Sequence, residues 1–184
     1  EMEERIIIAG FGGQGVMAMG QLLTYSGMVE EKNVSWLPSY GPEMRGGTAN
    51  CNVTISSDPV GSPVVVEATT AIVLNKPSLD KFETSVVPGG NLLINTSLID
   101  RKSNRDDLNV YYIPANEIAI ELGNVRIANM VMLGAYIEIT KAISVDSVYK
   151  AFEKVFGESK AHLLPINKQA LEKGAEAVKS LVNA

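Results

Sequence analysis

Apolar residues along the chain fall into short runs rich in Val and Ile that alternate with longer segments of helical period. The short runs predict strands at residues 6–10, 34–37, 49–55, 71–75, 91–95 and 110–113. The longer segments predict helices at residues 14–31, 77–84, 115–121, 127–142, 145–156 and 166–181. This alternation predicts an α/β fold, in which residues 1–184 form a single domain. We expect a Rossmann-like, open and mostly parallel sheet with helices on both faces.

The segment 48–66 departs from this alternation. Residues 50–55 alternate between polar and apolar, a turn with two prolines follows, and Val64, Val65 and Val66 resume the apolar pattern. We expect a hairpin inserted in the α/β core, which would make the sheet mixed.

The helix predicted near residues 127–137 is apolar on almost every side, so it must be covered on more than one side. The sheet can cover one side. A companion subunit can cover the other, since Gly134 and Ala135 allow close approach, or the domain's own core can do so. The sequence leaves both interpretations open.

Charge and composition exclude several classes of protein. The formal net charge is −5 and no basic cluster occurs, which argues against nucleic acid as a partner. The longest apolar stretch, near residues 130–137, is too short to span a bilayer. The charged residues before the first strand indicate no signal peptide, and the single cysteine excludes an internal disulfide. These observations favour a cytoplasmic protein without membrane contact.

The first predicted strand ends in a glycine-rich loop with the spacing Gly10-x-Gly12-x-x-Gly15. In a dinucleotide-binding loop of this spacing, the first glycine allows the tight turn and the second allows close phosphate approach. The third allows the helix to pack on the strand. Exposed N–H groups and the positive end of the following helix would bind phosphate. The alternative is a glycine-rich turn without a ligand.

The end of the second predicted strand argues against NAD. A nicotinamide dinucleotide site requires Asp or Glu there to bind the ribose hydroxyls. This strand runs into Pro38, Ser39 and Tyr40 instead, and Glu30 and Glu31 precede it. Another phosphate-bearing ligand, including a flavin, remains open.

A second loop, residues 39–48, follows this strand at the edge where open α/β sheets bind ligands. Arg45 can offer a planar fork to phosphate or carboxylate, and Glu43 can orient it or act as a polar anchor. The alternative is a tight turn with a surface ion pair. The residues that we expect to contact a phosphate-bearing ligand are Gly10, Gly12, Gly13, Gln14, Gly15, Ser39, Tyr40, Glu43, Arg45, Gly46, Gly47 and Asn75.

The two loops, together with the run Leu74-Asn75-Lys76-Pro77-Ser78-Leu79, resemble the gamma subunit of 2-oxoacid:ferredoxin oxidoreductases. The similarity spans nearly the entire chain. It is greatest to the 2-oxoglutarate type, and the pyruvate and ketoisovalerate types are related. The segment Tyr40 to Gly47 is the most specific part of the resemblance.

The resemblance implies a function that the chain performs only with partners. In this family the holoenzyme oxidatively decarboxylates a 2-oxoacid, with coenzyme A as acyl acceptor and ferredoxin as electron acceptor. Thiamine diphosphate, Mg²⁺ and iron–sulfur clusters are expected in the partners. These partners are the alpha and beta subunits of the same oxidoreductase, and the resemblance leaves open whether a delta subunit is present as well. Ferredoxin would be reached through those partners. The gamma subunit corresponds to a Rossmann-like domain of the single-chain pyruvate enzymes, which implies an association with coenzyme A.

The remaining candidate residues agree with this division of labour. Iron–sulfur clusters require several cysteines at set spacings, and this chain has only Cys51, in a predicted strand. His162 stands beside two leucines without a partner for acid–base catalysis. We therefore expect no catalytic residue and no metal ligand in this chain. The alternative function is a free-standing nucleotide- or flavin-binding oxidoreductase or a binding module.

Overall fold

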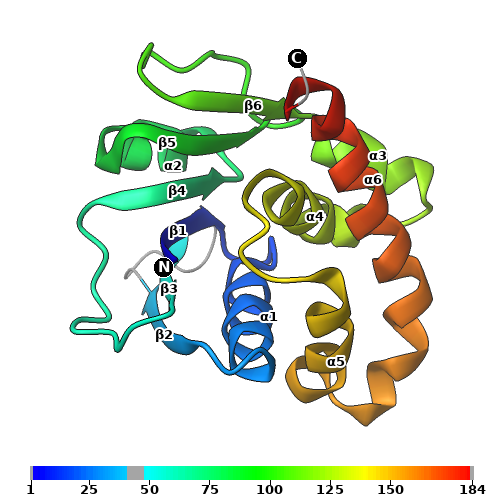
Figure 1. Cartoon of the computed structure of the whole chain (residues 1–184). Coiled ribbons are helices and arrows are strands. Elements are labelled where there is room, and N and C mark those ends of the chain that lie inside the picture. Colours follow the sequence, from blue (N-terminus) through cyan, green and yellow to red (C-terminus); the bar gives the residue numbers. More distant parts are fainter. Residues whose placement is uncertain (1, 41–47, 183–184) are drawn as a thin grey trace.

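The computed structural model of the chain describes residues 2–40 and 48–182. In this part, six strands form one sheet in the order β2-β3-β1-β4-β5-β6 (Figure 1). The strands are β1 (Glu3–Phe11), β2 (Asn33–Tyr40), β3 (Thr48–Ser56), β4 (Ala68–Val73), β5 (Val86–Asn95) and β6 (Asn109–Ile113). β3 is antiparallel to both of its neighbours, whereas β1, β4, β5 and β6 are parallel. The prediction of a mostly parallel, mixed sheet is confirmed.

Helices cover both faces of the sheet, as predicted, but very unequally (Figure 1). Ile6 and Ile8 of β1 point into the larger core cluster and Ile7 points into the smaller one. The larger cluster lies under α1 (Val16–Val29), α3 (Ala115–Glu121), α4 (Ala128–Thr140), α5 (Val145–Phe156) and α6 (Leu164–Val182). The smaller lies under α2 (Lys76–Phe82). The short 3-10 helices are η1 (Glu83–Ser85), η2 (Val125–Ile127) and η3 (Glu158–Leu163).

The expected hairpin within residues 48–66 is wrong in its second arm. Its first arm is β3, but β3 pairs with β1 on one side and with β2 on the other. No edge of β3 is therefore left for Val64, Val65 and Val66, which form no strand. Only Val65 is buried, whereas Val64 and Val66 are 54% and 75% exposed.

Helix α4 is the centre of the larger core. All of its residues from 129 to 137 are buried. Its outer side is covered by α6, because a Cβ atom at Gly134 would collide with the carbonyl of Leu171 and one at Gly174 with the carbonyl of Val131. The interpretation that a companion subunit covers this helix is therefore wrong, and the alternative of a helix in the domain's own core is correct.

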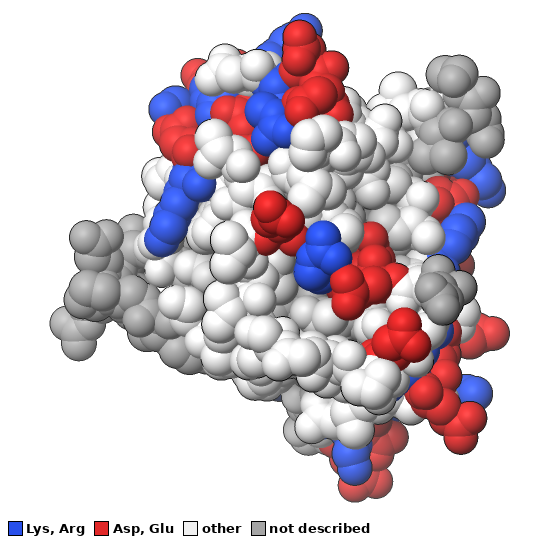
Figure 2. Space-filling view, turned by 60° about the vertical axis from the view of Figure 1, so that its left-hand side comes forward, with Lys and Arg blue, Asp and Glu red and all other residues white. Residues whose placement is uncertain are grey.

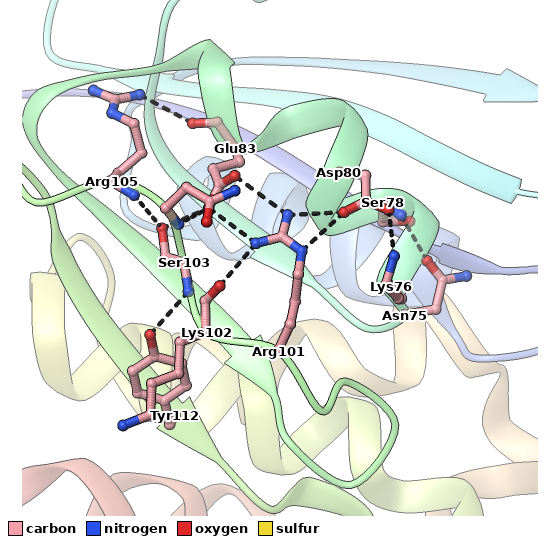
Figure 3. Close-up of polar contacts among 11 residues, drawn as sticks. Asn75, Lys76, Ser78, Asp80, Glu83, Arg101, Lys102, Ser103, Arg105 and Tyr112 are labelled. Carbon is pink, nitrogen blue, oxygen red and sulfur yellow. Dashed lines mark hydrogen bonds and ion pairs between the residues drawn. The ribbon is translucent and has the colours of Figure 1, made fainter.

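The connection from β5 to β6, residues 96–108, contains no helix and is fixed by a cluster of polar contacts (Figure 3). Glu83, which is 5% exposed, accepts hydrogen bonds from Ser103 Oγ (2.6 Å) and Asn104 N (2.7 Å). It also pairs with Arg101 (3.2 Å). Arg105 donates to the carbonyls of Glu83 and Val86, both at 3.0 Å. Burial raises the pKa of Glu83, but the hydrogen bonds from Ser103, Arg101 and Asn104 outweigh this effect, so the pKa is lowered.

None of the helices within residues 2–40 and 48–182 has the length and apolar character needed to cross a bilayer.

The α4–α6 crossing gives a test of the core. Alanine improves helix propensity by about 1 kcal/mol over glycine, but overpacking against a backbone carbonyl costs about 1–3 kcal/mol or more. We expect Gly134→Ala and Gly174→Ala each to lower the free energy of unfolding by about 1–2 kcal/mol, measured by urea titration. Gly61→Ala is the control, since a Cβ there meets no atom within 4 Å. A higher urea midpoint in either helix variant would contradict this account.

The Glu83 cluster gives a pH-dependent test. Because the pKa of Glu83 is lowered by folding, its contribution is fully present above its ordinary pKa and is lost as pH falls through the folded value. We expect Glu83→Gln to lower the free energy of unfolding by about 1–2 kcal/mol at pH 7. The gap to the wild type should shrink as pH falls below about 4.5. Glu176→Gln, in an exposed pair with Lys173, is the control and should change little. A gap that does not vary between pH 7 and pH 3 would refute the assignment.

Candidate functional site

The loop that joins β1 to α1 lies at the carboxyl edge of the parallel strands and is held by its own glutamine. The Gln14 side chain accepts a hydrogen bond from Phe11 N (2.5 Å) and donates one to the carbonyl of Leu74 (3.5 Å). Gly13 and Gly15 have φ values of +90° and +79°, which glycine adopts without strain. The shape of the loop therefore requires glycine at residues 13 and 15.

The glycines of this loop divide into packing positions and exposed positions. A Cβ at Gly10 would lie 2.6 Å from Gln14 Oε1, and one at Gly15 would collide with the amide of Asn129. Gly12 and Gly13 are exposed on the outside of the loop. Gly10 and Gly15 thus allow the strand, loop and helices to meet, while Gly12 and Gly13 present backbone that a ligand can approach.

Two helices begin side by side at this loop. The residues preceding α1 and α4, Gly15 and Ile127, supply no side-chain acceptor, and neither helix has an acidic residue in its first turn. Asn129 Nδ2 of α4 donates to the carbonyl of Gly15 (3.3 Å), which joins the two ends. The N-terminus of a helix has N–H groups without intrahelical partners and a partial positive charge. At α4, the N–H groups of Ala128 and Met130 already donate to the carbonyl of Val125 and to Asn129 Oδ1. The uncapped end of α1, with the positive end of α4 beside it and no carboxylate in either first turn, is therefore suited to an anion such as phosphate.

Three cavities border the loop, and Gly13 lines all of them. Their volumes are about 190, 300 and 560 Å³. The largest, which we call the C-terminal groove, runs from Gly13 and Gly15 past η2 to α5, η3 and α6. Its lining includes Arg126, Phe156 and Lys160, with no Asp or Glu among the lining residues that the structure describes. The lining of the groove is thus positively charged, although the net charge of the chain is −5. Figure 2 shows charged side chains of both signs on one face of the molecule.

Arg126 is a candidate site residue that the sequence reasoning missed. It is exposed and lines both the C-terminal groove and the smallest of the three cavities. The sequence signal was Gly123-Asn124-x-Arg126 just before a helix, a glycine-led turn comparable with that before α1. Gly123 has a φ of +100°, and the side chain of Asn124 accepts from Arg126 N (3.0 Å). This turn places Arg126 on η2, two residues before α4 begins.

The strand register places the start of the second predicted loop at the same edge. Ala49 of β3 is aligned with Tyr40 of β2 and with Gly10 of β1. The ends of β1 and β2 are therefore separated by β3, at a distance of about 10 Å for two strand spacings. This spacing differs from a dinucleotide-binding fold, in which the second strand lies beside the first. It gives a second reason, besides the missing acid, to disfavour NAD. The predicted ligand residues Glu43, Arg45, Gly46 and Gly47 lie outside the described residues.

Asn75 has a structural role at this edge. Its Oδ1 accepts a hydrogen bond from Ser78 N (3.0 Å), so it caps the N-terminus of α2. The side chain is buried, and its Nδ2 has no hydrogen-bond partner among the described residues. A ligand contact at Asn75 stays a prediction.

The chain's thiol and imidazole do not lie at the loop. Cys51 is buried under α1, and burial raises its pKa to about 12, so the thiolate form is not populated near neutral pH. His162 is exposed on η3, where Nδ1 lies 3.1 Å from the carbonyl of Ser159. In the part of the chain that the structure describes, no group of three or more His, Cys, Asp or Glu side chains could hold a metal ion.

Sequence comparison finds relatives over nearly the whole chain. The family profile described as pyruvate ferredoxin/flavodoxin oxidoreductase matches residues 5–177. The ketoisovalerate oxidoreductase subunit VorA of Methanothermobacter marburgensis is 41% identical over 95% of this chain, which spans 36% of that relative's length. The 2-oxoglutarate synthase subunit KorC of Methanocaldococcus jannaschii is 33% identical, and the match covers 98% of this chain and 97% of KorC.

Solved structures have the same fold. The gamma subunit of a keto/oxoacid ferredoxin oxidoreductase from Geobacter sulfurreducens aligns with a TM-score of 0.84 at 24% identity, over 98% of both chains. The 2-oxoglutarate:ferredoxin oxidoreductase from Magnetococcus marinus aligns with a TM-score of 0.87 at 23% identity, over 98% of this chain and 32% of that one. The profile match and the identity to KorC show that the chain belongs to the pyruvate ferredoxin/flavodoxin oxidoreductase family.

Proposed function

We propose that this chain is the gamma subunit of a 2-oxoacid:ferredoxin oxidoreductase and binds coenzyme A next to a partner's active site. The observation that carries the proposal is the pair of helix N-termini without acidic neighbours at the glycine-rich loop. Family membership supplies the reaction class, and the Magnetococcus marinus enzyme has coenzyme A and succinyl-CoA bound.

Coenzyme A matches the chemistry of this edge of the sheet. Its diphosphate is an anion of the size that a helix N-terminus and a glycine-rich loop bind. In our proposal the diphosphate lies against Gly12, Gly13 and Gly15, with Gly10 and Gln14 holding the loop in shape. From the sequence we add Ser39, Tyr40, Glu43, Arg45, Gly46, Gly47 and Asn75 as further candidates for contacts with coenzyme A.

The oxidation itself is assigned to partner subunits. Decarboxylation of a 2-oxoacid requires an electron sink for the developing carbanion, which amino-acid side chains do not provide and thiamine diphosphate does. Ferredoxin reduction then requires a redox centre, for which the buried Cys51 is unsuited. We assign thiamine diphosphate, Mg²⁺ and the iron–sulfur clusters to alpha and beta subunits. The VorA relative, in which the matching segment is 36% of a longer chain, supports close association of this unit with the rest of such an enzyme.

The substrate is proposed at the level of the 2-oxoacid class. Relatives named for ketoisovalerate and for 2-oxoglutarate are 41% and 33% identical, so identity does not single out one acid. The acid would be bound chiefly by the partner that holds thiamine diphosphate.

The loops can be tested in the assembled oxidoreductase. We expect Gly12→Val and Arg45→Ala each to raise the KM for coenzyme A at least about tenfold, equivalent to roughly 1.4 kcal/mol of lost binding, while assembly is unchanged. Gly61→Val is the control, because Gly61 has no neighbour within 4 Å of a Cβ and follows β3 at the opposite edge of the sheet. Wild-type kinetics with coenzyme A in both loop variants would refute the phosphate site.

The dependence on partners gives a separate test. We expect the isolated chain to reduce neither ferredoxin nor a viologen with any 2-oxoacid, and activity to appear when it is co-expressed with its companion subunits. A colourless preparation with no saturable NAD binding by calorimetry is expected as well. The assignment is wrong if the isolated chain is active, if it carries a flavin absorbance band, or if the companions are fully active without it.

A further inference from the structure

Asn129 is the polar side chain through which α4 contacts the glycine-rich loop. It is the second residue of α4 and is only 7% exposed, so its amide is held inside the protein. Its Nδ2 donates to the carbonyl of Gly15 (3.3 Å), and its Oδ1 accepts from Met130 N (3.0 Å). The two ends of one amide are thus bonded to two different helix ends.

The carbonyl that accepts from Asn129 also starts α1. Met19 N donates to the same Gly15 oxygen at 3.0 Å, and a carbonyl oxygen has lone pairs for both donors. This carbonyl and the N–H of Val16 belong to one planar peptide group. The N–H of Val16, the first residue of α1, has no intrahelical partner. A donor that holds the Gly15 carbonyl therefore also fixes the direction in which this free N–H points.

The packing around Gly15 is close enough to make this contact specific. A Cβ at residue 15 would collide with the Asn129 amide and would lie 3.3 Å from Asn129 Cβ. The third glycine of the loop therefore leaves room for Asn129 as well as adopting a positive φ. Asn129 also lines two of the three cavities that border the loop. A charge at this position would act on any ligand that the loop binds.

Resting on the function proposed above, we propose that Asn129 is a positioning residue for coenzyme A binding. Its amide holds the Gly15–Val16 peptide in the orientation that presents the Val16 N–H to the diphosphate, so it acts through Gly15. An aspartate can still accept from Met130 N, but it has no donor for the Gly15 carbonyl. It also places a negative charge beside the anion site. The position therefore requires an amide and not a carboxylate.

The test uses the assembled oxidoreductase carrying Asn129→Ala or Asn129→Asp. Asn129→Ala removes the donor alone, so the KM for coenzyme A should rise about threefold to tenfold. Asn129→Asp removes the donor and adds a charge, so the KM should rise more than about tenfold. The kcat and the KM for the 2-oxoacid should stay unchanged, because the loop does not take part in the oxidation.

Ionic strength separates the two variants further. The ratio of variant to wild-type KM for coenzyme A should fall with added salt for Asn129→Asp, because salt screens the repulsion between carboxylate and phosphate. The same ratio should not change for Asn129→Ala. A residue that merely supports the fold would not give this difference.

Asn109→Asp is the matched control. Asn109 Nδ2 donates to the carbonyl of Gly89 (3.1 Å), so the substitution removes the same kind of donor and adds the same charge. Asn109 begins β6, which runs parallel to β5, and therefore lies at the opposite edge of the sheet from the glycine-rich loop. The variant should keep the wild-type KM for coenzyme A at every ionic strength.

A double variant tests whether Asn129 acts through Gly15. In the wild-type background, Gly15→Ala brings a Cβ into the Asn129 amide, whereas in the Asn129→Ala background only the strain of the positive φ remains. Gly15→Ala should therefore raise the KM for coenzyme A by a smaller factor in the second background. Equal factors in the two backgrounds would show that the two residues act independently, which contradicts the proposal.

The outcomes separate this role from the function on which it rests. If Gly12→Val raises the KM for coenzyme A and neither Asn129 variant does, the loop site stands and the positioning role is refuted. The role is also refuted if the Asn129 variants lower kcat and raise the KM for the 2-oxoacid to the same extent, or fail to assemble, because the residue is then structural. If neither the loop variants nor the Asn129 variants change the KM for coenzyme A, the function proposed above fails.

Discussion

The close crossing of α4 and α6 is the constraint on which the rest of the molecule depends. Gly134 of α4 lies against a backbone carbonyl of α6, and Gly174 of α6 lies against a backbone carbonyl of α4. The two helices therefore pack in close contact, with α4 held between α6 and the sheet. With α4 fixed in this way, its first turn reaches the glycine-rich loop, where Asn129 bonds to Gly15. Two glycines in the middle of helices thus determine the geometry of a surface site. Glycine lowers the helix propensity at such positions, but it leaves the space that the opposite helix occupies.

The candidate site depends on the absence of a capping side chain at a helix N-terminus as much as on the residues that are present. A Ser, Asp or Asn before α1 would satisfy its free N–H groups and stabilise the helix by about 1 kcal/mol. Glycine occupies this position instead. The N-terminus of α1 is therefore left to be satisfied by solvent or by a ligand, which is the arrangement expected when binding rather than stability has determined the residue.

The sequence predicts those features that depend on neighbouring residues. The glycine spacing between strand and helix identifies the loop, and the β-branched runs identify the strands. Arg126 was not found because its relation to Gly15 comes from the packing of segments more than a hundred positions apart. The hairpin prediction failed for a related reason: alternation in residues 50–55 indicates a half-buried strand, but not that it pairs on both sides. The all-round apolar character of α4 likewise indicates burial without naming α6 as its cover.

The burial of Cys51 has a consequence for work on any larger assembly. It is the single cysteine of the sequence, and its sulfur lies where a Cβ at Gly20 would reach it, 2.6 Å away. A thiol that is shielded by a helix and un-ionised at neutral pH does not react with maleimides or iodoacetamide. Such reagents therefore do not label the folded chain. In a complex labelled under native conditions, the signal will come from the companions or from a cysteine introduced on purpose, for example at an exposed position of α5.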